Sequence, residues 1–219
     1  MSMYESVVTF FQSGGMFMIP IVIVLAVGLA IAIERYIDLS KTSLTNQIAW
    51  KKIQKMLSSG NLNEAVNFAN KSKCAISQIM GYGISSAKTS RRRDDIETAM
   101  EEGLMEVVPK LEKRTHYLAT FANVATLLGL LGTIIGLIDA FTSISEANPA
   151  EKADLLSSSI SVAMNTTAFG LMVGIPLLLL HSWLQTKTTE IVDSLEMASV
   201  KVLNSITSAM RPDSKAPTA

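Results

Sequence analysis

The chain has 219 residues, of which 48% are hydrophobic, and its mean hydropathy is +0.33. These values exceed those of a usual soluble domain and predict an integral membrane protein. Nineteen basic and nineteen acidic residues give a formal net charge of zero, and no aromatic residues interleave with the basic runs, so nucleic-acid binding is not expected. No nucleotide-binding glycine loop, Cys/His metal spacing or Ser/His/Asp set is visible, so we expect neither an enzyme nor a bound cofactor.

The first transmembrane helix is predicted over residues 16–38. Its uncharged part, Met16 to Ile33, is long enough to cross most of a hydrocarbon core of about 30 Å. Residues 1–15 precede it without any basic residue, and we expect them to form a short segment outside the membrane. Residues 39–93 show apolar side chains at helical spacing, which predicts a cytoplasmic helical region.

A single long helix is predicted over residues 94–142. Asp94 and Glu97 are spaced as a capping box at its start. Pro109 lies inside this helix and is expected to kink it. The stretch from Ala122 to Phe141 carries a single charged residue, near its outer end, and is therefore predicted to be the second span.

The third span is predicted from Ser159 to Leu180, where no residue is charged. It opens a long helix, residues 159–209, that continues into the cytoplasm. Residues 143–158 contain a proline and several small polar side chains, so we expect a short loop outside the membrane. Residues 210–219 are predicted to be a disordered tail.

The distribution of basic residues predicts the topology. No Lys or Arg precedes Arg35, thirteen lie from Lys41 to Arg114, and Lys152 alone lies between Arg114 and Lys187. Because basic residues collect on the cytoplasmic side, the N-terminus is expected outside and the C-terminus in the cytoplasm. The predicted fold class is an all-α integral membrane protein with three transmembrane helices and long cytoplasmic helical extensions.

Small residues line one face of the second span and one face of the third. Gly132 and Gly136 in the second span, and Gly170 and Gly174 in the third, have the GxxxG spacing at which helices pack closely in lipid. The predicted helix-packing residues are Gly129, Gly132, Gly136, Ala163, Gly170 and Gly174.

Each of these faces also carries a threonine at a similar predicted depth. Thr133 and Thr167 both lie about eight residues inside the outer end of their spans, roughly 12 Å from the outside. Hydroxyls at one depth, repeated in several copies around an axis, would form a polar ring that replaces part of an ion's hydration shell or relays a proton. Ordinary interhelical hydrogen bonding, worth about 0.6 kcal/mol per contact, would explain them equally well.

Several stretches of the chain resemble the MotA/TolQ/ExbB family of stator and proton-channel proteins, with the three-span layout of ExbB and TolQ. They are Glu34-Arg35 at the end of the first span, Leu118 to Phe141 and Ala163 to Pro176. The run GLLGT from Gly129 to Thr133 is specific when it occurs together with TAxGL from Thr167 to Leu171. With the order of the spans and the loop lengths, the resemblance covers nearly the whole chain.

The resemblance implies a homopentamer in the bacterial inner membrane that surrounds the transmembrane helices of two copies of an ExbD/TolR/MotB-like partner. In that family the partner brings an Asp that carries the ion, and the pentamer turns around the partner dimer as ions descend their gradient. The motion drives work at the outer membrane, the cell wall or a flagellar motor. By matching positions, Thr133 and Thr167 correspond to the pore-facing threonines of the family, and H⁺ or Na⁺ would be the transported ion.

Two residues depart from the family pattern. Val162 stands where ExbB and TolQ carry a glutamate early in the third span, and Thr126 stands where they favour proline. Because valine cannot exchange a proton, any titrating carboxylate must come from the partner, and coupling to Na⁺ stays open. The same valine leaves a second hypothesis open, in which the chain is a non-conducting membrane scaffold that holds a partner complex.

Overall fold

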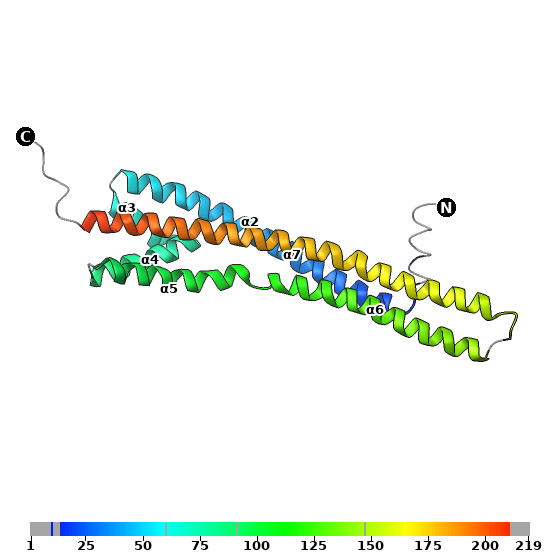
Figure 1. The fold of residues 1–219 in the computed structure, drawn as a ribbon. Coiled ribbons are helices and arrows are strands. Elements are labelled where there is room, and N and C mark those ends of the chain that lie inside the picture. The colour runs from blue at the N-terminus through cyan, green and yellow to red at the C-terminus, as the bar shows by residue number, and fades with distance from the viewer. Residues whose placement is uncertain (1–9, 11–13, 60, 91, 147, 211–219) are drawn as a thin grey trace, which may run out of the picture. The chain divides into compact units, whose positions relative to one another are not determined.

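The structure is a computed structural model that describes residues 10, 14–59, 61–90, 92–146 and 148–210. Three stretches of it are long and apolar enough to cross a membrane, and they fall in α2, in α6 and in α7. The predicted fold class, an all-α multi-pass membrane protein, is confirmed. The helices drawn in Figure 1 are α2 (Met18–Ser58), α3 (Leu62–Lys71), α4 (Ala75–Thr89), α5 (Arg93–Glu112), α6 (Thr115–Glu146) and α7 (Lys152–Met210).

The chain divides into two compact units. The first, which we call the membrane unit, comprises Met1–Arg35 and Arg114–Leu184. The second, which we call the extension unit, comprises Tyr36–Lys113 and Gln185–Ala219. Helices α2 and α7 each have one part in the membrane unit and the other part in the extension unit.

Large apolar side chains cover the surface of the membrane unit. Leu127, Ile138 and Leu179 are 62%, 57% and 67% exposed. Small residues are buried instead, as at Gly28 of α2, where an added Cβ would lie 2.8 Å from Leu177 Cδ2 of α7. Lipid chains are as apolar as these side chains, so apolar residues outside and small residues between helices are the arrangement expected in a bilayer.

The single helix predicted over residues 94–142 is instead two helices, α5 and α6, separated at Lys113 and Arg114. Pro109 has no N–H to donate to the carbonyl four residues before it, and the N–H of Lys113 bonds Pro109 O at 3.1 Å as α5 ends. Arg114 then adopts a left-handed φ of 66°. Its guanidinium donates to the carboxylate of Glu34 at 2.6 Å, which ties the start of α6 to α2.

The capping box predicted from Asp94 and Glu97 does not form. α5 begins one residue earlier, at Arg93, and the residue before it makes no side-chain cap. Glu97 instead forms an ion pair along the helix with Arg93, in which Glu97 Oε2 lies 3.8 Å from Arg93 Nε. Ser90 provides the polar contact at this end, because its Oγ accepts a hydrogen bond from Arg92 N at 3.2 Å.

The loop predicted over residues 143–158 is mostly helical. α6 continues to Glu146, and α7 begins at Lys152, before the predicted start of the third helix. The hydroxyls in this stretch donate to carbonyls of their own helix, as those of Ser143 and Ser158 do at 2.8 and 3.0 Å. Because these hydroxyls are satisfied inside the helix, small polar residues do not force a loop here.

The extension unit has a core of its own, in which α4 packs against α3 and α5. A Cβ on Gly103 of α5 would lie 3.1 Å from Ile79 Cα, so these two helices approach to backbone contact. The side chains at the centre are almost fully buried, which indicates an ordinary close-packed interior. They include Ile53, Ile79, Met80, Ile96, Met100 and Leu195.

A chain of polar contacts crosses from α4 to α5 on the surface of this unit. Glu106 accepts hydrogen bonds from Lys110 Nζ at 2.7 Å and from Tyr82 OH at 2.6 Å. The hydrogen bond from Lys110, followed by that from Tyr82, lowers the pKa of the Glu106 carboxyl. The hydrogen bond to Glu106 and the negative charge of that carboxylate raise the pKa of the Tyr82 phenol.

We expect Glu106→Gln to alter the acid end of the stability profile. A carboxyl with a lowered pKa in the folded chain stabilises it above the ordinary value of 4.5, and that contribution is lost as the pH falls through the lowered pKa. The variant should therefore be less stable than the parent near neutral pH, and the two should converge in acid. Thermal unfolding in detergent between about pH 3 and 7 measures this. Glu112→Gln, at an exposed carboxylate of the same helix, is the control, and an identical profile for both variants would contradict the expectation.

Candidate functional site

The candidate site lies where α6 and α7 come into backbone contact. A Cβ on Gly170 would lie 2.7 Å from Ala125 O and 3.0 Å from Gly129 Cα. Side-chain carbons do not approach backbone atoms this closely in folded proteins, so glycine at residue 170 is required by the contact. The small-residue faces of the two spans therefore meet each other within one chain.

The other predicted packing residues extend this contact along both helices. A Cβ on Gly136 would lie 3.0 Å from Ala163 Cβ, towards the outer end. A Cβ on Gly174 would lie 3.0 Å from Ala122 O, towards the opposite end of the contact. The residue numbers rise along one helix as they fall along the other, so α6 and α7 are antiparallel.

Thr167 joins the two helices at this contact. Its Oγ1 donates a hydrogen bond to Gly129 O of α6 at 2.8 Å. The hydroxyl reaches a carbonyl of the neighbouring helix because Gly129 has no side chain to keep the two backbones apart. Thr167 is half-buried, and its proton is committed to an interhelical hydrogen bond.

Thr133 lies at the edge of the same contact. It follows Gly132, whose added Cβ would run into the side chain of Thr166 on α7. The hydroxyl of Thr133 donates to Leu130 O of its own helix at 2.6 Å. Its side chain is half-buried, so the oxygen is open to groups outside the α6–α7 pair.

The two hydroxyls lie at nearly the same level along the helices. Gly136 lies opposite Ala163 in the antiparallel register. In this register the residue opposite Thr133 is Thr166, one position from Thr167, a difference of about 1.5 Å along the helix. The structure thus places both threonines at one level, with Thr167 inside the contact and Thr133 beside it.

Sequence reasoning missed Thr166, which is 2% exposed. Its Oγ1 lies 2.6 Å from Gly14 O and 3.0 Å from Val162 O, so both carbonyls are within reach of its single proton. Gly15 has a φ of 71° and its added Cβ would lie 3.2 Å from Val162 Cγ1. Two adjacent glycines directly before an apolar run were the signal that the chain turns closely against another helix at this point.

The described residues of the predicted outside segment, residues 1–15, lie against α7. The rings of Phe10 and Phe169 are 6.2 Å apart in an edge-to-face contact. Gly14 contacts Thr166, which lies seven residues, or about 10 Å, inside the predicted start of the third span. Phe10 and Gly14 therefore lie against α7, and the placement of residues 1–15 outside the membrane stays a prediction.

The chemistry of the site follows from where the hydroxyl protons go. Both Thr133 and Thr167 donate to backbone carbonyls, so their oxygens present lone pairs and act as acceptors towards any further group. An acceptor oxygen at this level fits a protonated carboxyl or a cation, and it cannot store a charge itself.

The two spans carry almost no ionisable groups. Asp139 is the single ionisable residue from Ala122 to Phe141, and the stretch from Ser159 to Leu180 has none. No group of three or more His, Cys, Asp or Glu side chains suited to a metal occurs in the part of the chain that the structure describes.

We expect Gly170→Ala to destabilise the membrane unit. The new methyl would collide with backbone atoms of α6, which cannot rotate away as a side chain does, so a cost of about 1–3 kcal/mol is expected. Gly81→Ala is the matched control, because a Cβ at that position of α4 meets nothing within 4 Å. Alanine there should raise helix stability by up to about 1 kcal/mol. Thermal unfolding of the two purified variants in detergent distinguishes them, and equal shifts would contradict the close contact at Gly170.

Comparison with known proteins agrees with the resemblance. A sequence model of the MotA/TolQ/ExbB proton channel family matches residues 71–197, more than half of the chain. The chain is 29% identical over 197 residues to an ExbB homolog of Methanothermobacter thermautotrophicus, which covers 89% of this chain and 68% of that protein. It is 32% identical over 93 residues to the Tol-Pal system protein TolQ of Haemophilus influenzae, 42% of this chain and 40% of that one. It is 35% identical over 81 residues to the biopolymer transport protein ExbB of Aquifex aeolicus, 37% of this chain and 54% of that one.

Proposed function

The chain belongs to the MotA/TolQ/ExbB proton channel family, and we propose that it is the ion-channel subunit of a motor in the bacterial inner membrane. The motor converts a gradient of H⁺ or Na⁺ into mechanical work. Each elementary charge that falls through 100 mV releases about 2.3 kcal/mol, which is an adequate source for such work. The names of the relatives, biopolymer transport and the Tol-Pal system, support a role in energy transduction for this chain.

The observation that carries the proposal is the state of two hydroxyls at one level in the membrane unit. Thr133 and Thr167 give their protons to backbone carbonyls and keep their oxygens as acceptors. A protonated carboxyl that passes this level would donate to them, and a Na⁺ ion would be coordinated by them. The ion path therefore runs past Thr133 and Thr167.

The partner supplies the carboxylate in this proposal. Valine at residue 162 and the absence of acidic residues from Ser159 to Leu180 leave the third span without a proton carrier. A single-span ExbD/TolR/MotB-like protein with an intramembrane Asp, present as a dimer inside a homopentamer of this chain, meets the requirement. The N-terminus of the chain would lie outside and the C-terminus in the cytoplasm.

We expect Thr133→Val and Thr167→Val each to abolish partner-dependent ion flux. Valine has nearly the shape of threonine but no oxygen to accept a hydrogen bond or bind a cation. Thr133→Ser and Thr167→Ser keep the oxygen and should keep most of the flux. The measurement uses vesicles containing the chain co-purified with its single-span partner, under an imposed H⁺ or Na⁺ gradient.

Thr126→Val is the matched control for this experiment. Thr126 is also back-bonded, to Ala122 O at 3.1 Å, but it lies seven residues from Thr133, about 10 Å along the helix. Assembly of every variant is measured by native mass spectrometry, so that loss of flux is separated from loss of the complex. Full flux in both valine variants at 133 and 167 would show that the ion does not pass these residues.

The second candidate is a non-conducting scaffold that holds a partner complex in the membrane. Its support is Val162, an apolar side chain at the place where ExbB and TolQ carry a glutamate. This side chain packs against Gly15. Under this alternative the parent chain would assemble with its partner and pass neither H⁺ nor Na⁺. The flux measurement on the parent complex therefore decides between the two candidates.

A further inference from the structure

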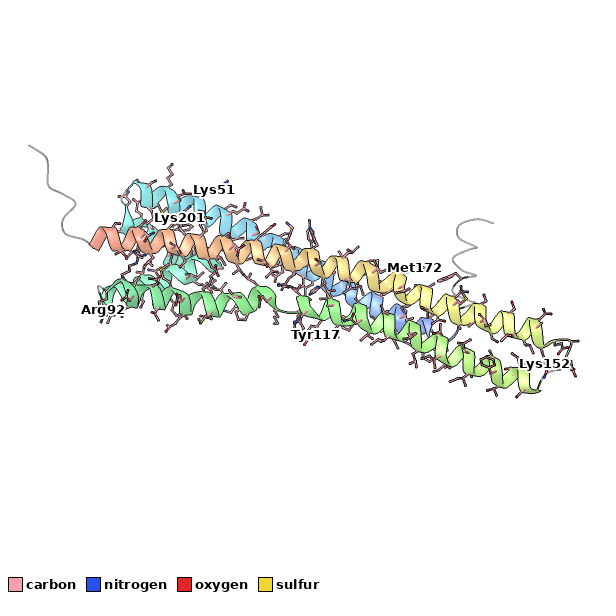
Figure 2. All side chains as sticks on the ribbon, in the orientation of Figure 1. Lys51, Arg92, Tyr117, Lys152, Met172 and Lys201 are labelled. Atoms are coloured by element: carbon pink, nitrogen blue, oxygen red, sulfur yellow. The ribbon has the colours of Figure 1, made fainter. Side chains whose placement is uncertain are left out.

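Opposite charges are concentrated on two different helices of the extension unit. α5 carries seven acidic and two basic residues, a net charge of −5. The part of α2 in this unit, Tyr36–Ser58, carries four lysines and one aspartate, a net charge of +3. In the view of Figure 2, Lys51 on α2 and Arg92 just before α5 lie on opposite sides of α7, which carries Lys201. The two charged surfaces therefore lie on different sides of the unit.

The lysines of α2 lie on one face together with two exposed apolar side chains. At 100° per residue, all of them fall within about 60° of Ile48, whereas the buried Ile53 lies about 140° away. Leu44 and Ile48 are 60% and 58% exposed, which is unusual for large aliphatic side chains on a polar helix. We call this surface the basic face of α2, made of Lys41, Leu44, Ile48, Lys51, Lys52 and Lys55.

A groove between α5 and α7 has the complementary character. Its volume is about 250 Å³, and Glu97, Glu101 and Glu196 lie along it. The apolar lining includes Val200, which is 53% exposed. Glu97 lies 3.8 Å from Arg93, so part of its charge is already balanced, and no lysine lines the groove. We call this surface the acidic groove, made of Glu97, Met100, Glu101, Leu104, Glu196, Ser199, Val200 and Leu203.

The basic face and the acidic groove lie at the same height along the unit. α2 and α7 run in parallel, since residues 46–50 share a cavity with residues 194–198 and residues 50–58 share one with residues 201–205. In this register Ile48 to Lys55 is level with Glu196 to Leu203, the α7 side of the groove. α5 runs the opposite way beside α7 in Figure 1, which brings Glu101 level with Lys51.

We propose that the basic face of α2 in one copy of this chain docks into the acidic groove of the next copy. Copies inserted in one bilayer share their orientation, so a closed ring has its axis along the membrane normal and keeps every residue at its own height. The face and the groove share no residue, so the contact is head-to-tail and repeats around the ring. This inference rests on the homo-oligomer of the proposed function and names the surfaces that join its subunits.

Lipid headgroups do not account for the lysines at the far end of the basic face. Lys51 and Lys55 lie sixteen and twenty residues beyond Arg35 along α2, roughly 24–30 Å of helix. Electrostatic attraction to an anionic leaflet falls off over about 8 Å at physiological ionic strength. Ile48 also requires an apolar counterpart, and the apolar side chains that line the groove offer one.

Disulfide cross-linking in membranes tests the contact. The variant for this test is the full chain with Cys74→Ala, which removes its single cysteine, and with Lys51→Cys and Glu101→Cys. Because each copy then has both halves of the contact, mild oxidation should give a ladder of cross-linked oligomers. The control pair is Gln54→Cys with Glu101→Cys, since Gln54 lies on the α7 side of α2 at a similar height. That pair should give no ladder.

Charge reversal provides an independent measurement on the same contact. Glu101→Lys with Glu196→Lys should lower the oligomeric fraction, as should Lys51→Glu with Lys55→Glu, because each places like charges across the contact. The chain with all four reversals should regain the oligomer, which a folding defect would not permit. Native mass spectrometry of the complex in detergent reports each fraction.

The outcomes separate this inference from the proposed function. An oligomer with partner-dependent ion flux but no ladder from Lys51→Cys with Glu101→Cys would overturn the proposed surfaces and leave the function standing. Cross-links to a different protein, with none between copies, would also overturn them. A chain that conducts nothing yet gives the ladder and the charge-reversal rescue would support the surfaces and refute the ion-channel function.

Discussion

The backbone contact between α6 and α7 is the constraint on which the membrane unit depends. At Gly170 an added methyl would press on Ala125 O, so the two helices touch without side chains between them. In lipid this closeness supplies the dispersion contacts that hold helices together, because no hydrophobic driving force acts between apolar surfaces already out of water. It also lets the Thr167 hydroxyl reach Gly129 O, and the antiparallel register then sets the level of Thr133.

Many hydroxyl groups among the described residues donate to carbonyls of their own or a neighbouring helix. Thr133 and Thr126 bond within α6, and Ser143 and Ser158 do the same near the turn between α6 and α7. A satisfied hydroxyl lowers the cost of a polar group in hydrocarbon while leaving an acceptor oxygen. The same hydrogen bonds therefore let the hydroxyls lie within the helices and give the proposed ion path its acceptors.

The proposed ion path and the proposed ring contact use different units of the chain. The first is apolar and closely packed, with few ionisable groups, so a carboxylate brought by a partner would be the main charge at that level. The second concentrates opposite charges on α2 and α5, where water and a neighbouring copy can meet them.

The sequence by itself determined the three apolar spans, the small-residue faces and the family, because hydropathy, GxxxG spacing and the paired GLLGT and TAxGL runs are local patterns. It did not determine where the long helix divides, since Arg114, at the break, pairs with Glu34, eighty residues away in the chain. The two adjacent glycines signalled a close turn, but that Thr166 is the residue Gly14 meets was likewise beyond local pattern. Only the tertiary structure decided that the small faces meet each other within one chain, because which surfaces pair depends on how whole helices approach.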